Sequence, residues 1–141
     1  MADILQLIEM VLTLTGPGNV SANVFLQDIT EVVEVSAYDQ IDAQVFLYAL
    51  ESGGSVKVTL LTSMLRDEKL DGWEVLGEVS LALATGGAPS HKSVTFPAPI
   101  LATTTDAPVP LLRYLRWMIE FTGGATRASV RLLGMLRRRG D

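Results

Sequence analysis

Hydrophobic and polar residues alternate with a period of two along much of this chain, which is typical of β-strands whose two faces meet different surroundings. The clearest case is the stretch 112–121. Its two faces are Arg113, Leu115, Trp117, Ile119 and Phe121 on one side, and Leu112, Tyr114, Arg116, Met118 and Glu120 on the other. Because Trp117 shares its face with aliphatic and aromatic residues, the pattern predicts that Trp117 is buried in a core.

Several other segments predict strands. They lie at 29–36, 41–50, 56–64, 73–83 and 94–96, with a last strand from 125 to about 136. The segment 38–40 predicts a corner, and the glycines at 53 and 54 predict a hairpin between the strands on either side. In the strand at 73–83, one face is expected to carry Trp73, Val75, Gly77, Val79 and Leu81.

This succession of short strands predicts an all-β fold, an antiparallel β-sandwich that is jelly-roll-like and has about seven or eight strands. An immunoglobulin-like order stays open, because spacing does not reveal which strands are neighbours. The sandwich domain is expected at 29–141. Within it, four of the six prolines fall in 97–110, which predicts an extended loop.

Residues 1–28 are expected to form an N-terminal arm or a first strand. The apolar positions of this segment fit either a helix or a strand, and they have no reason to face water. We therefore expect them to contact a neighbouring subunit or a larger assembly. The predicted interface residues are Ile4, Leu5, Leu7, Ile8, Val11 and Leu12, together with Arg113 and Arg116.

The composition supports an interacting surface. The chain has 141 residues, of which 48% are hydrophobic and 19% are charged, whereas charged residues make up about a quarter of an average soluble domain. Its mean hydropathy is +0.33. A sandwich of this size cannot hide nearly half of its residues, so another chain is expected to cover part of the apolar surface.

The charge argues against nucleic acid as a partner. The formal net charge is −5, whereas a nucleic-acid-binding protein needs a basic face for phosphates. The absence of cysteine excludes disulfides and thiolate metal sites. The N-terminus lacks a basic signal-peptide region, and no apolar run is long enough to cross a membrane, so neither secretion nor a membrane partner is expected.

No set of residues points to catalysis, a cofactor or a metal. His91 is the only histidine and lies in a polar stretch that predicts a solvated loop. Asp67, Glu68 and Asp71 lack the spacing of a calcium loop. The protein is therefore expected not to be an enzyme. A carbohydrate-binding module that stacks sugars on Trp73, Trp117 or Tyr114 is the alternative, although the tryptophans lie in phase with aliphatic residues and favour a core or an interface.

Several segments together resemble a known group of proteins. They are Ile41-Asp42-Ala43-Gln44-Val45, Val56 to Met64, Gly72-Trp73-Glu74-Val75-Leu76-Gly77 and Leu112 to Trp117. In these patterns, over about 36–136, the chain resembles the small β-sandwich virion structural proteins of tailed bacteriophages that decorate or cement capsids. The resemblance implies a non-enzymatic protein of the virion, made in the host cytoplasm. Its partners would be a major capsid or other virion protein and further copies of itself, as a homotrimer.

Overall fold

The computed structural model of the chain describes residues 2–6, 12–96 and 110–138, with side chains from residue 12 onward. Three short 3-10 turns, η1 (Ile29–Glu31), η2 (Leu70–Gly72) and η3 (Thr85–Gly87), interrupt a series of strands. The strands are β1 (Ala2–Gln6), β2 (Leu12–Thr15), β3 (Val24–Leu26), β4 (Val33–Glu34), β5 (Tyr38–Glu51), β6 (Ser55–Ser63), β7 (Glu74–Leu81), β8 (Ser90–Phe96), β9 (Tyr114–Thr122) and β10 (Arg127–Arg138).

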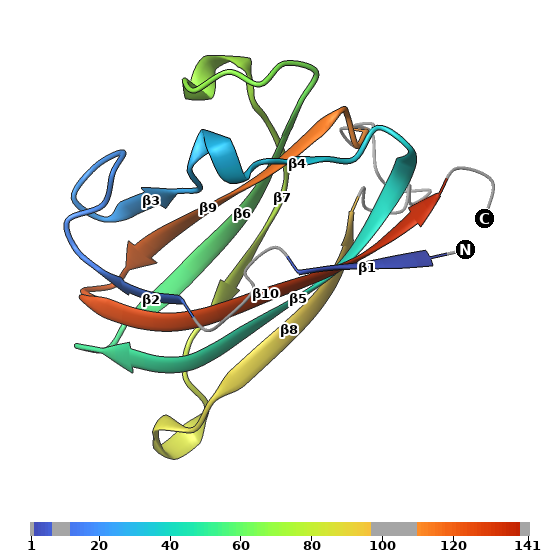
Figure 1. Cartoon of the computed structure of the whole chain (residues 1–141). Coiled ribbons are helices and arrows are strands. Elements are labelled where there is room, and N and C mark those ends of the chain that lie inside the picture. The colour runs from blue at the N-terminus through green and yellow to red at the C-terminus, as the bar shows by residue number, and fades with distance from the viewer. Residues whose placement is uncertain (1, 7–11, 97–109, 139–141) are drawn as a thin grey trace, which may run out of the picture.

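Within the described residues these strands form two antiparallel sheets that face each other (Figure 1). Sheet A has the order β1-β10-β5-β8, and β2 also pairs with β10. Sheet B has the order β3-β9-β6-β7, and β4 also pairs with β9. If β1 with β2, and β3 with β4, each count as one interrupted strand, the sheets read first–eighth–third–sixth and second–seventh–fourth–fifth. This wrapping is a jelly roll, so the predicted fold class is confirmed.

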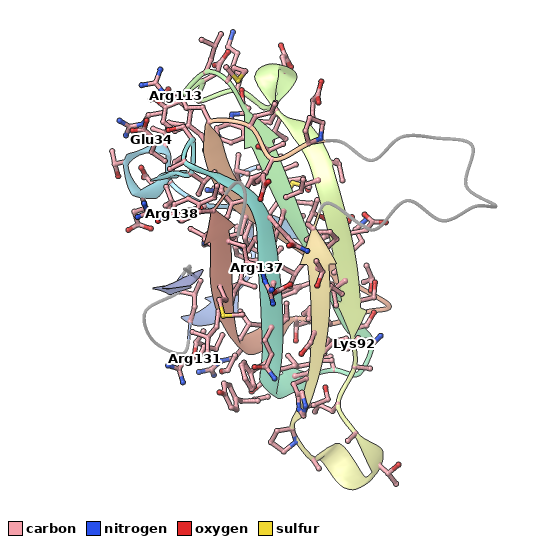
Figure 2. All side chains as sticks on the ribbon, turned by 90° about the vertical axis from the view of Figure 1, so that its right-hand side faces the viewer. Glu34, Lys92, Arg113, Arg131, Arg137 and Arg138 are labelled. Atoms are coloured by element: carbon pink, nitrogen blue, oxygen red, sulfur yellow. The ribbon has the colours of Figure 1, made fainter. Side chains whose placement is uncertain are left out.

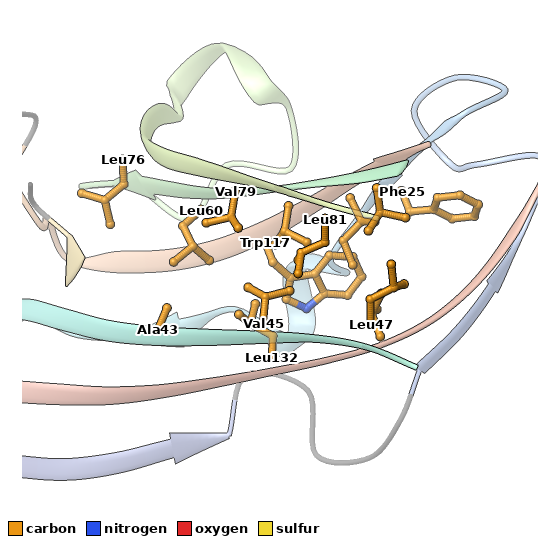
Figure 3. Packing of buried hydrophobic residues seen from close by; sticks show 14 of the residues in the cluster. Phe25, Ala43, Val45, Leu47, Leu60, Leu76, Val79, Leu81, Trp117 and Leu132 are labelled. Atoms are coloured by element: carbon orange, nitrogen blue, oxygen red, sulfur yellow. The ribbon is translucent and has the colours of Figure 1, made fainter. Parts of the chain in front are cut away.

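The core lies between the two sheets, and the alternation seen in the sequence fills it. In β5 every second residue from Ile41 to Leu47 is buried, and it meets side chains of β6, β7 and β9 from the other sheet (Figure 3). Trp117 is only 7% exposed and its indole lies between the sheets (Figure 3). The predicted burial of Trp117 is confirmed.

The turn after β5 does not form the predicted hairpin. β5 belongs to sheet A and β6 to sheet B, so the chain crosses between sheets at Gly53 and Gly54. The turn after β9 makes a second crossing at Gly123 and Gly124. A Cβ atom on Gly54 would lie 2.2 Å from the carbonyl oxygen of Thr122, so the two crossings pack too closely for a side chain there. The glycines mark sheet-to-sheet corners, which look like hairpin turns in the sequence.

A β-bulge in β7 overturns the predicted face of Trp73 and Val75. Leu60 pairs with Gly77 but Leu61 pairs with Val75, so Leu76 is an extra residue on β7. An extra residue reverses the alternation on one side of the bulge. As a result Leu76 enters the core, while Val75 is 51% exposed and away from the face of Val79. Trp73 also leaves that face and is buried in a separate cluster with Leu26 and Leu61.

Two predicted elements differ in type. The segment 29–36 is β-branched, yet it forms η1 and the two-residue β4 and not one strand. Asp28 explains the break, because its carboxylate accepts a hydrogen bond of 2.9 Å from the Thr30 amide and caps η1. The expected corner at 38–40 is the regular start of β5. The expected loop falls mainly on 97–109, outside the described residues.

We predict that Trp117→Ala lowers the free energy of unfolding by about 3–5 kcal/mol, the range for removing a large buried aromatic side chain. Urea denaturation followed by circular dichroism measures this loss. Val20→Ala, at an exposed position, is the control. A Trp117→Ala midpoint equal to that of the parent would contradict the packing described here.

Candidate functional site

The predicted N-terminal interface residues divide into described and undescribed positions. Ile4 and Leu5 belong to β1, whose backbone pairs with Met135 and Gly134 of this chain's own β10. Leu12 begins β2 and packs half-buried against the core. Leu7, Ile8 and Val11 lie outside the described residues. Contact of this segment with a second subunit stays a prediction, as does the division of the chain at residue 28.

The two predicted interface arginines have different surroundings. Arg113 is exposed, and its Nε lies 3.3 Å from a carboxylate oxygen of Glu34, beside which it stands in Figure 2. Arg116 is only 4% exposed and lies on the outer face of sheet B. Arg113 is therefore available to a partner, whereas Arg116 is buried and bonded to backbone carbonyls of its own chain.

Arg116 joins three segments that are distant in the sequence. Its Nε donates a hydrogen bond of 2.7 Å to the carbonyl of Gln27, and its Nη1 donates to the carbonyls of Asp67 and Glu68 at 3.3 and 3.2 Å. The guanidinium lies 5.4 Å from the ring centre of Trp73. These contacts hold the loop before η1 and the loop before η2 against β9.

The electrostatics of Arg116 reflect this position. Burial lowers the pKa of its guanidinium, and the nearby carboxylates of Asp28, Glu68 and Asp67 act in the opposite direction. Backbone carbonyls accept hydrogen bonds from its Nε and Nη1, and such acceptors lower the cost of burying a charge. The arrangement is a structural clasp, and it covers a second small core of Leu26, Leu61 and Trp73.

The aromatic residues named for sugar stacking do not form a platform. Trp73 and Trp117 are both buried, and Tyr114 packs half-buried against the second small core. The Nε1 of Trp73 donates a hydrogen bond of 2.7 Å to the carbonyl of Asp67. Both tryptophans are thus buried, Trp117 in the main core and Trp73 in the second small core, and a carbohydrate-binding role stays a prediction.

The outer face of sheet A carries a groove that the sequence did not predict. Because alternate residues of β5 enter the core, the residues between them project outward. A shallow groove of about 580 Å³ lies among side chains of β10, β5 and β8. The paired register aligns three rows across these strands, which from β10 to β8 are Met135–Asp42–Thr95, Leu133–Gln44–Ser93 and Arg131–Phe46–His91.

Asp42 is the anchored charge of this groove. It accepts a hydrogen bond of 2.6 Å from the Thr95 hydroxyl and one of 2.8 Å from the Nε of Arg137, which reaches across from β10 to β5 (Figure 2). The hydrogen bond from Thr95 is the largest cause of the lowered pKa of the Asp42 carboxyl; burial opposes it, and the hydrogen bond and charge of Arg137 add to the lowering. Asp42 is therefore ionised at neutral pH.

Aromatic side chains border the groove on the Gln44 side. The rings of Phe46 and Tyr48 are nearly parallel, with an interplanar angle of 4° and centres 6.0 Å apart. The ring of Phe46 also lies 5.8 Å from that of His91. His91 was expected in a loop, but it lies exposed on β8. The face thus combines hydrogen-bonding groups with an aromatic surface.

Only one strand of this groove could be predicted from the sequence. The alternation at 41–47 already assigns Asp42 and Gln44 to one face of one strand. Their neighbours come from 93–95 and 133–137, and this pairing depends on the register of strands far apart in the chain. Local pattern does not encode that register.

The described residues also hold an apolar patch at one end of sheet B. Met64 and Leu65 follow β6 and are 59% and 69% exposed, and Val75 near the start of β7 is 51% exposed. Thr62 pairs with Glu74, so both segments lie at the same end of the sheet. We call Met64, Leu65 and Val75 the apolar end patch.

The described part of the chain contains no group of three or more His, Cys, Asp or Glu side chains placed to hold a metal ion. None of its helical segments is long and apolar enough to cross a membrane.

No protein-family model and no curated protein sequence matches this chain. Solved structures do share its fold. The chain is similar to a chain of the T13 IBDV viral particle, with a TM-score of 0.58, 9% identity, and coverage of 98% of this chain and 31% of the other. For the infectious bursal disease virus VP2 subviral particle the values are 0.53, 10%, 98% and 32%. This chain thus spans about a third of those viral chains.

A third similar structure is the Eiger TNF of S. frugiperda, with a TM-score of 0.51, 12% identity, and coverage of 100% of this chain and 93% of the other. At such low identities, these similarities establish the β-sandwich fold and nothing more specific. The same fold occurs in viral capsid chains and in a TNF.

We predict that Arg116→Met destabilises the protein by about 2–4 kcal/mol, because the substitution removes the donor to the buried Gln27 carbonyl and to the part-buried Glu68 carbonyl. Arg113→Met is the matched control and should cost at most about 1 kcal/mol, since its ion pair with Glu34 is exposed. Urea denaturation measures both. Equal losses would contradict the different roles of the two arginines.

The lowered pKa of Asp42 predicts a pH dependence. A carboxylate with a lowered pKa in the folded state stabilises the protein above its unfolded pKa of about 4, and this contribution is lost as the pH falls through the folded pKa. Asp42→Asn should therefore lower the melting temperature at neutral pH, with the difference from wild type vanishing in acid. Asp39→Asn, at an exposed position of the same strand, is the control. A difference that persists at low pH would contradict the assignment.

Proposed function

We propose that this protein is a non-enzymatic structural component of a virus particle that decorates or cements a bacteriophage capsid lattice. In this proposal the jelly roll presents surfaces to other proteins and performs no reaction. Its partners are a major capsid or other virion protein and further copies of the chain, assembled as a homotrimer. The likeness to chains of viral particles supports the proposal at the level of fold.

The observation that carries the proposal is the apolar end patch. Three large hydrophobic side chains lie more than half exposed at one end of sheet B, and two of them are consecutive. Exposure of such a cluster costs free energy in water that a covering protein recovers. The bulge in β7 turns Val75 outward and thereby enlarges the patch.

The size of the patch suggests how it would be used. A stable one-to-one complex buries about 1,600 Å² in total, which is far more than three side chains provide. The patches of one homotrimer would bind simultaneously to equivalent positions of a repeating lattice. Once one patch is bound, the others are held near their positions at a high effective concentration, which raises the overall affinity. Many weak contacts fit the decoration of a capsid better than one strong contact.

We predict that the chain purifies with virus particles and depends on the apolar end patch for this. The gene is tagged in its native genome, released particles are separated on a density gradient, and the tag is measured in the particle fraction. Leu65→Asp should remove most of the chain from that fraction, because a charge cannot be buried unpaired in an apolar contact.

Val20→Asp is the matched control, since Val20 is exposed but lies outside the patch. It should leave the chain on the particles. Absence of the wild-type chain from purified particles would contradict the virion role. Equal retention of Leu65→Asp and Val20→Asp would contradict the role of the patch. Light scattering of the purified chain tests the homotrimer separately.

A further inference from the structure

We propose that the groove on the outer face of sheet A binds a neutral oligosaccharide. The groove crosses β10, β5 and β8, and its floor is backbone at Ala43, Val94 and Gly134 between two rows of side chains. Its volume of about 580 Å³ lies within the roughly 300–1,000 Å³ typical of ligand sites. This site lies on the sheet opposite the apolar end patch and is independent of the proposed virion role.

Two polar side chains in the groove have no hydrogen-bond partner in the described part of the chain. Within the described residues, the side chains of Gln44 and Ser93 make no hydrogen bond. Each is both a donor and an acceptor. They lie side by side on paired strands, so their positions are fixed by the sheet. A ligand with many hydroxyl groups matches this mixture of donors and acceptors.

The charges of the groove favour a neutral ligand. Asp42 and Arg137 neutralise each other across a contact of 2.8 Å. Thr95 further fixes the Asp42 carboxylate at 2.6 Å. The carboxylate retains lone pairs and the guanidinium retains Nη donors, so the pair still offers both to a hydroxyl group. A strongly charged ligand would have to compete with the existing ion pair.

Apolar surface is present on both sides of the polar row. Leu133 and Met135 line the groove from β10, and the ring of Phe46 stands next to Gln44 on the same face of β5, between Tyr48 and His91. Sugar rings have C–H faces that pack on aromatic and aliphatic side chains, and hydroxyl edges that need hydrogen bonds. The groove supplies both kinds of contact along one line.

The strand pairing argues against an extended peptide in this groove. A peptide that adds to a sheet needs a free backbone edge. β5 is paired on both sides, by β10 and β8, and β10 is paired by β5 and by β1 and β2. Among the described strands, β8 is an edge strand of sheet A, but its free edge faces away from β5, so a peptide strand added there would lie beside the groove and not in it. Three strands spaced by about 4.8 Å give a floor roughly 10 Å across, enough for two linked sugar rings.

The test is a titration of the isotopically labelled full chain, followed by backbone amide resonances. The probes are soluble neutral tetrasaccharides of glucose, mannose, xylose or N-acetylglucosamine, added one at a time to millimolar concentration. At least one should shift the amides of Asp42, Gln44, Ser93 and Thr95. The double substitution Gln44→Ala and Ser93→Ala should weaken that binding about tenfold or more, since it removes the side-chain donors and acceptors that have no partner among the described residues.

Gln40→Ala is the matched control, because Gln40 lies on the same face of β5 as Asp42 and Gln44, pairs with Arg137 of β10, and does not line the groove. It should change the affinity by less than about twofold. Spectra of each variant without sugar report whether the fold is retained, and Ser93→Ala alone replaces the double variant if it is not. The proposal is overturned if no tetrasaccharide shifts these amides, if the shifts lie elsewhere, or if the groove variants bind like the wild type.

Discussion

The pairing of β10 with β5 is the constraint on which the rest of this structure depends. β10 holds the centre of sheet A, with β5 along one side and β1 and β2 along the other, so the last strand joins the first to the middle of the chain. The register of this pair decides which residues of β5 enter the core. It also aligns Met135 with Asp42 and Leu133 with Gln44, and thereby forms the outer groove.

Sheet B differs from sheet A in that part of its outer face is also buried. There the alternation of apolar and polar residues fails, and Leu61 packs under Trp73 while Arg116 is enclosed by loops. A buried guanidinium is tolerable only when acceptors surround it, and the carbonyls of Gln27, Asp67 and Glu68 do so. The same cation thus fixes two loops that have no regular structure of their own. What remains exposed at that end is the apolar patch.

The sequence predicted the fold class and the inner faces well, because alternation along β5 and β9 is a local property of the chain. It placed Trp117 correctly for that reason. It failed where the outcome depends on partners: the glycines at 53 and 54 look like a hairpin turn until β5 and β6 are known to lie in different sheets. Trp73 and Val75 were assigned to the wrong face because the bulge opposite Leu60 and Leu61 leaves no local signature. The groove was missed because its rows come from three separate segments.

The backbone register of β5 between β10 and β8 tests the account most directly. Cross-strand nuclear Overhauser effects between backbone protons of the full chain measure it. We expect contacts of Asp42 with Met135 on one side and with Thr95 on the other. A shift of β5 by one residue would turn Ile41 and Ala43 outward and bury Asp42 and Gln44. Contacts displaced in that way would contradict both the core and the outer groove described here.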